Sequence, residues 1–425
     1  MSSAHSSVAR FPSVASTCSR AKTITGTGIL GVLFVANVYD PTGALRVKYV
    51  AFCLTALFAV WTLKHLDLSQ SEMATGLLLF VVWPLWSLLY GAARKSDVTV
   101  GLTEVTPFLF ALPLVTVLRV AGEKTALRLF YACMLSLATV VIISFGLLIL
   151  FPEGAISSTL FNVLSSLHER EGYFGAKPLG DTQVPGIYFG STLFLVPAVV
   201  YYLFAGKTLR AVVVFLGLAF AFSKAGIAIV IAFGLAHSIR FFLSRRGLRS
   251  VDRTPTRWLL YLRAALPFIL LAVLAGSVLL AFPSFTEQVA DTVAGESETA
   301  QIRIGHFDSV IKLFTDNPHY LLIGQGVGLP FYTSGESEFV QNIEVDHLNT
   351  IRKFGLPWFI GFTAVVFYSS WRLIRSKDQE ACAFGFALMS MYLAAGTNPV
   401  LLAPLSIMLM MMSYFLQRKY HARAS

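Results

Sequence analysis

The feature that most constrains the fold is a series of long apolar runs that recurs along nearly the whole chain. A helix of about 20 apolar residues crosses a bilayer, because the hydrocarbon core is roughly 30 Å thick. Only 13% of the 425 residues are charged, whereas a soluble domain carries about 25%. A transmembrane β-barrel would instead show short segments that alternate apolar and polar residues. The sequence therefore predicts an all-α polytopic membrane protein.

We predict about twelve transmembrane helices, at 24–39, 48–64, 74–93, 104–120, 127–151, 185–205, 208–222, 225–243, 258–282, 356–371, 381–397 and 400–416. The segment 208–243 is long enough for one continuous helix. We expect two helices there, because Ser223 and Lys224 lie near its centre. A lysine at bilayer depth costs about 2.5–3.5 kcal/mol unless it meets water or a partner.

The basic residues indicate how these helices are oriented. The chain has a net charge of +10, but its cations lie in short loops between apolar runs, as topology signals do. This placement argues against nucleic acid as a partner. The segment 240–263 holds seven arginines and one acid, Asp252, so we place it in the cytoplasm. The basic stretches 372–377 and 418–423 indicate the same side.

Counting spans from these loops puts both termini in the cytoplasm, as tails 1–22 and 417–425, with the transmembrane domain at 23–416. The Ser-rich start shows no signal-peptide pattern. The outer loops are then 152–184 and 283–355. Arg94 and Lys95 also fall outside, a mild conflict with the positive-inside rule. A bacterial inner membrane fits this plan.

The outer loop 283–355 is unusually long and polar. It contains ten acidic and four basic residues, and a loop of this length is rarely a mere connector. Within it, 303–314 has apolar residues at helical spacing and predicts an amphipathic helix that lies on the outer leaflet or against the bundle. Asp316-Asn317-Pro318 should end this helix. The stretch 342–354 is long enough for a second helix.

His347, with Glu344 and Asp346, is the sharpest catalytic candidate. Glu344 and His347 are three residues apart, so on a helix they would share a face. A carboxylate beside an imidazole raises its pKa and orients it, which suits general-base work or a grip on an anionic leaving group. The alternative is a solvated loop histidine beside an ordinary carboxylate.

Three cations are further candidates, each with a simpler alternative. Arg303 opens the predicted amphipathic helix and could bind phosphate, or it could reach the lipid headgroups as an interfacial arginine. Lys224 could bind substrate within the membrane, or face water at a helix end. Arg170 stands near aromatic and polar residues that could hold a sugar, or belongs to an ordinary charged loop.

Several patterns are missing from the sequence. There is no phosphate-binding loop of an ATP-driven pump, no Asp-x-Asp sugar-nucleotide site, and no Cys/His spacing typical of a metal site. No evident internal repeat supports an inverted-repeat transporter. We therefore expect neither a metal nor another cofactor.

Four features resemble the O-antigen ligase and O-antigen polymerase superfamily of bacterial envelope enzymes. The first is Ser223-Lys224-Ala225-Gly226 before a long apolar helix, where the family typically has Ser-Arg-x-Gly. The second runs from Arg303 through Asn317-Pro318 to the glycine series 324–328. The third is the passage 344–349 followed by 354–359. The fourth is the plan of about twelve spans with one large late periplasmic loop.

The resemblance implies a metal-independent inverting glycosyl transfer from a glycan on undecaprenyl diphosphate. By position, Arg303 and Lys224 would grip the diphosphate, and His347 would activate the acceptor hydroxyl or assist the leaving group. The remaining residues that we expect at the site are Glu344, with a catalytic role, and Arg170, Asp346, Asn349 and Arg352, which would bind substrate.

Two departures from the family pattern bear on the activity. Lysine replaces the usual arginine at Lys224, which keeps the charge but loses bidentate phosphate geometry. Leu348 intervenes before Asn349, which favours a polymerase of repeat units over a ligase. The alternatives are a ligase that moves finished glycan to lipid A core or protein, and a secondary transporter or lipid flippase. Expected partners are membrane lipids and the pathway's own flippase and chain-length regulator.

Overall fold

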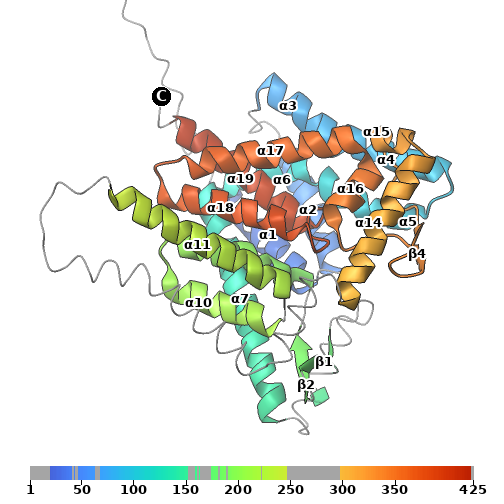
Figure 1. Cartoon of the computed structure of the whole chain (residues 1–425). Coiled ribbons are helices and arrows are strands. Elements are labelled where there is room, and N and C mark those ends of the chain that lie inside the picture. Colours follow the sequence, from blue (N-terminus) through green and yellow to red (C-terminus); the bar gives the residue numbers. More distant parts are fainter. Residues whose placement is uncertain are drawn as a thin grey trace, which may run out of the picture.

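The computed structural model describes residues 20–40, 46–62, 68–151, 174–179, 182–187, 190–221, 223–246 and 297–422, with a few positions between them. These residues are mostly helical, with two two-stranded antiparallel hairpins (Figure 1). This agrees with the predicted all-α class, to which the structure adds two short hairpins. The predicted span 258–282 and the residue Arg170 lie outside the described residues.

The first half of the chain contains α1 (Arg20–Tyr39), α2 (Val47–Thr62), α3 (Gln70–Leu77), η3 (Leu78–Val82), α4 (Trp83–Ala93), α5 (Val98–Leu109), α6 (Ala111–Ala121) and α7 (Glu123–Leu150). The middle contains β1 (Phe174–Leu179), β2 (Thr182–Ile187), η4 (Gly190–Phe194), α9 (Leu195–Phe204), α10 (Thr208–Phe220) and α11 (Lys224–Arg246). The last part contains α14 (Glu298–Asp316), α15 (His319–Ile323), β3 (Phe331–Thr333), β4 (Glu338–Val340), α16 (Asp346–Phe354), α17 (Leu356–Ile374), α18 (Gln379–Ala394) and α19 (Pro404–Ala422).

Four helical segments of the described chain are long and apolar enough to cross a membrane. They are Arg20–Tyr39, Gln70–Ala93, Val98–Ala121 and Glu123–Leu150, and shorter apolar helices accompany them. Many large apolar side chains on these helices are exposed, such as Leu57, Leu89 and Leu150 at 65–72%. Apolar surface of this kind is stable against lipid and unfavourable in water. The structure therefore supports a helical membrane protein.

Most predicted spans coincide with helices, but several boundaries differ. The predicted break at Ser223 separates α10 from α11. The span predicted from residue 185 begins too early, because Thr182–Ile187 form the strand β2. The first and last helices extend into the predicted tails, since α1 begins at Arg20 and α19 ends at Ala422.

Contacts among α9, α11 and α18 define the two ends of the bundle. The helices α9 and α11 run parallel, because Gly226 packs near Val196 and the ring of His237 lies 4.5 Å from that of Phe204. The helix α18 runs antiparallel to them, because Gln379 at its start donates to the carbonyl of Phe204 at 3.2 Å. The turn after α18 (395–403) therefore lies at the end where α9 and α11 begin. We call this the loop end.

The segment before α17 folds into a cap, defined here as residues 297–355. It consists of α14, α15, the β3–β4 hairpin and α16, which Figure 1 shows together beside α4 and α5. Val310, Phe331 and Ile343 form a small core inside the cap that is separate from the main one. The predicted amphipathic helix is α14, which ends at Asp316 as expected but begins at Glu298, so Arg303 lies inside it.

The glycine-rich turn of the cap is fixed by close approach to α4. Gly326 has a φ of +98°, and a Cβ there would lie 2.8 Å from the backbone N and Cα of Gly91. Gly324 has a φ of +80° and packs against the backbone of Lys353 and Phe354. Gly326 therefore allows the cap to meet α4 backbone to backbone, and Gly324 allows the turn to pack against α16 within the cap.

Gly326→Ala is accordingly expected to destabilise the protein by about 1–3 kcal/mol, because the new methyl group meets backbone in a strained conformation. Thermal unfolding of the purified protein in detergent measures this. Gly28→Ala is the matched control, since a Cβ at Gly28 has no atom within 4 Å. Its melting temperature should equal or slightly exceed the wild-type value, because alanine is the better helix former. Equal melting temperatures for Gly326→Ala and wild type would contradict the packing argument.

Candidate functional site

Arg303 joins the cap to the bundle at the loop end. Its Nε and Nη2 atoms bind Oε2 of Glu344 at 2.9 and 2.8 Å. Nη2 also donates to the carbonyl of Thr397, in the turn after α18, at 3.3 Å. The side chain keeps 26% of its surface exposed. A guanidinium that is held in place and still partly open can bind an anion without losing much conformational freedom.

His347 lies in the first turn of α16, half-buried. Its ring packs against the rings of Tyr392 at 4.5 Å and Phe359 at 5.8 Å. It hydrogen-bonds to the backbone of Tyr392, while its buried Nε2 has no hydrogen-bond partner. Burial lowers the pKa of His347, so the imidazole is neutral at neutral pH. A neutral imidazole held through one nitrogen, with the other unpaired, has the arrangement of a general base.

Arg303 and His347 meet at the same turn. A Cβ at Gly396 would lie 3.8 Å from Nδ1 of His347, and the next residue, Thr397, accepts the hydrogen bond from Arg303. The structure therefore brings these two predicted site residues to one turn. They are 44 residues apart along the chain, and the turn from a third segment brings them to one place.

The predicted pairing of Glu344 with His347 is wrong in its geometry. Glu344 precedes α16 and does not share a helical face with His347. Its carboxylate binds Arg303. The expected rise in the pKa of His347 is also not seen, because burial lowers it. Glu344 therefore orients Arg303 and leaves the imidazole neutral.

Asp346 anchors α16 to the turn. It is 2% exposed, its N–H donates to the carbonyl of Ala395 at 3.1 Å, and its Oδ2 accepts from the N–H of Leu401 at 2.5 Å. Burial raises the pKa of Asp346 to about 6, against the opposing effect of the Leu401 N–H and the charge of Lys353. An internal residue of this kind positions the turn and has no exposed surface for substrate.

The raised pKa predicts a pH dependence of stability. Asp346 binds a proton more tightly in the folded state, so its stabilising contribution is complete below its ordinary pKa of about 3.9. That contribution is lost as the pH rises through about 6. Asp346→Asn cannot titrate, so the difference in unfolding free energy between variant and wild type should change by roughly 2–3 kcal/mol between pH 4 and 7.5. Unfolding in detergent at both pH values measures it, and a difference that does not vary with pH would refute the shift.

Asn349 and Arg352 are also internal. Both are at most 1% exposed. Arg352 donates to the side chains of Gln325 and Asn349 and to the carbonyls of Leu329 and Gln341, and its guanidinium lies 4.3 Å from the ring centre of Phe331. These bonds tie α16 to the cap. We therefore propose a structural role for them in place of the expected substrate contacts.

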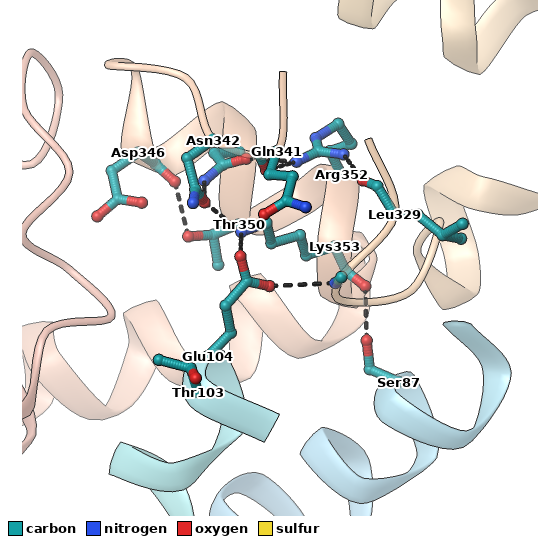
Figure 2. A network of polar contacts seen from close by, with 12 residues as sticks. Ser87, Thr103, Glu104, Leu329, Gln341, Asn342, Asp346, Thr350, Arg352 and Lys353 are labelled. Carbon is teal, nitrogen blue, oxygen red and sulfur yellow. Dashed lines mark hydrogen bonds and ion pairs between the residues drawn. The ribbon is translucent and has the colours of Figure 1, made fainter. Parts of the chain in front are cut away.

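Sequence reasoning missed a buried ion pair beneath this region. Lys353, 1% exposed, binds Oε1 of Glu104 at 2.6 Å and also contacts Oδ1 of Asn342. Figure 2 shows Glu104 of α5 reaching up to Lys353, with Asn342 beside it and Ser87 of α4 bonded to the Lys353 carbonyl. An acid inside an apolar run is itself a signal of a buried partner, and Glu104 carried that signal.

A second missed group is His306, one turn beyond Arg303 on α14. Its Nδ1 lies 2.7 Å from Oγ1 of Thr333, and its Nε2 lies 3.1 Å from Oε1 of Glu336. The side chain is fully buried, and burial lowers its pKa. His306 thus fastens α14 to the β3–β4 hairpin.

Lys224 starts α11 at the loop end. Its side chain is exposed, and the preceding Ser223 accepts a hydrogen bond from the N–H of Gly226 at 3.3 Å. A cation at a helix start is opposed by the helix dipole. The loop end also holds Arg303 and His347. Among the described residues, no cluster of His, Cys, Asp or Glu has the grouping that a metal ion needs.

Comparison with known proteins adds no identity: neither a protein-family model nor a curated protein sequence matches the chain significantly.

Proposed function

We propose that this protein is a membrane glycosyltransferase that polymerises undecaprenyl-diphosphate-linked oligosaccharide repeat units at the periplasmic face of a bacterial inner membrane. The observation that carries the proposal is the meeting of Arg303 and His347 at the Gly396–Thr397 turn. One supplies a fixed cation and the other an unprotonated base. Lys224 lies at the same end of the bundle. These are the groups that the family resemblance implies for the transfer.

The reaction follows from these groups. The reaction requires that substrate binding uncovers the buried Nε2 of His347. This atom then takes the proton from the acceptor hydroxyl, whose oxygen forms a bond to the anomeric carbon of the donor. The bond from that carbon to the diphosphate oxygen breaks, and the electron pair leaves with the lipid diphosphate. Arg303 and Lys224 stabilise the departing charge, which is worth most where water is excluded. The activated donor supplies the energy, so the step requires no cofactor.

Glu344 contributes by positioning. Two guanidinium nitrogens of Arg303 bind its carboxylate. This contact fixes the orientation of the guanidinium plane relative to the Gly396–Thr397 turn. Glu344→Gln should therefore weaken donor binding and raise the KM for the donor more than it lowers kcat. Loss of kcat alone would instead favour a direct catalytic role.

The proposed topology has about twelve spans, with both termini in the cytoplasm. It is supported by the positions of basic residues at the end opposite the loop end. Lys207 and Arg210 follow α9 there, and the basic stretch 372–377 precedes α18. The cap and the α18–α19 turn then face the periplasm.

The test of function is a gel of envelope and secreted glycans from a deletion strain, with and without the wild-type gene. We expect single repeat units in the deletion and a ladder once the gene returns. Full-length chains that remain on the lipid carrier would instead indicate a ligase. An unchanged glycan profile would refute both enzymes and favour a transporter or flippase. The proposed partners are the flippase and the chain-length regulator of the same pathway.

A further inference from the structure

A pair of cations lies at the loop end, away from the Arg303–His347 site. Arg94 and Lys95 form the turn between α4 and α5, and both are exposed. Arg94 Nη1 donates to the carbonyl of Gln325 in the cap at 3.2 Å. Cations on the outer side oppose the positive-inside preference, so topology does not account for them.

Aromatic rings hold Arg94 in place. Its guanidinium lies 4.7 Å from the ring centre of Tyr320 on α15 and 5.8 Å from that of Tyr90 on α4. Tyr90 in turn stacks on Trp86, with ring centres 6.3 Å apart. A merely interfacial arginine would reach for headgroups with a free side chain. Arg94 is instead held by a hydrogen bond to the cap and by two aromatic rings, and it stays exposed.

The surface beside this pair is apolar. Leu89 is 65% exposed and Trp86 is 50% exposed on α4, and Leu322 is 60% exposed on α15. Tryptophan and tyrosine prefer the level of the lipid headgroups. Arg94 and Lys95 therefore lie beside an apolar surface that suits a lipid chain and beside rings that suit the headgroup level.

We propose that Arg94 and Lys95 form a second phosphate site, which binds the lipid diphosphate of the acceptor substrate. This inference rests on the proposed function, because a polymerase joins two glycans that are each attached to a lipid diphosphate. The Arg303 site holds the diphosphate that leaves. The second substrate keeps its diphosphate and needs an anchor at the membrane surface, which the Arg94–Lys95 pair provides.

The experiment is a binding stoichiometry with undecaprenyl diphosphate, measured by native mass spectrometry on the full chain in lipid nanodiscs. Wild type is expected to bind two equivalents. The variant Arg94→Gln/Lys95→Gln should bind one, Arg303→Gln should bind one, and the triple variant should bind none. Arg375→Gln is the matched control, because Arg375 also stacks on an aromatic ring, Trp371, at 4.1 Å, and lies toward the opposite end. It should bind two.

The outcomes separate this inference from the proposed function. One equivalent in wild type, lost in Arg303→Gln, would refute the second site and leave the function standing. No binding in wild type would contradict the proposed function. Two equivalents in Arg94→Gln/Lys95→Gln would also refute the site. Equal displacement by phosphatidylglycerol would show a general headgroup site and overturn the assignment to substrate.

Discussion

His347→Ala is expected to lower the rate of glycan transfer by about 10²–10⁴-fold, the contribution of a general base. The neutral ring with its unpaired Nε2 would be lost, while α16 would keep its anchor at Asp346. Arg303→Ala should also abolish long polysaccharide, because the leaving diphosphate loses its fixed cation. Both variants should insert into the membrane at wild-type levels. The assay is the glycan ladder from cells that carry each variant, quantified against protein abundance.

The matched control for the histidine is His319→Ala. His319 is an exposed histidine of the same cap, at the start of α15, and its loss should leave the ladder unchanged. For the arginine, Arg303→Lys keeps the charge but not the fork that meets Glu344, so it should retain part of the activity. A normal ladder from both well-expressed alanine variants would refute the site.

Glu104→Ala is expected to destabilise the protein by about 3–5 kcal/mol, because it leaves a buried lysine without its partner. Lys353 is 1% exposed, and Glu104 is its carboxylate partner at 2.6 Å. Lys353→Met should cost less, because Glu104 remains 12% exposed and still accepts from the N–H of Gly328 at 3.3 Å. Thermal or denaturant unfolding in detergent gives both values.

The double variant Glu104→Leu/Lys353→Met makes this test sharper. Replacing a buried ion pair by apolar groups of similar size is often neutral or stabilising, so the double variant should be more stable than Glu104→Ala. Equal stabilities of the two single variants and wild type would show that the pair does not hold the cap on α5. As a surface control, Lys207→Ala breaks a bridge to Glu380 in which both side chains are at least 35% exposed, and it should have almost no effect.

The sequence predicted the helices well because their signal is local. Long apolar runs and breakers such as Ser223 and Asp316-Asn317-Pro318 act within a few residues. It also proposed Arg303 and His347 for one site through the order of motifs, and the structure brings both to the Gly396–Thr397 turn. It did not predict that Glu344 binds Arg303 instead of His347, because helical spacing applies only where a helix exists, and α16 begins two residues later.

The buried network of the cap was beyond sequence reasoning for a different reason. Arg352 was expected to bind substrate, and Lys353 was only counted among the basic residues of the loop 283–355. Their partners Gln325 and Glu104 are 27 and 249 residues away. These long-range contacts depend on how the cap packs against α4 and α5. Gly326, which permits the contact with α4, entered the sequence analysis only as part of the glycine series 324–328.

The most direct test of the central claim uses the purified protein in proteoliposomes with lipid-linked repeat units extracted from the deletion strain. We predict a ladder of longer glycans that remain attached to the lipid carrier, formed by wild type and not by His347→Ala. If the wild-type protein is folded and correctly inserted but the repeat units keep their original length, the proposed polymerase activity would be contradicted.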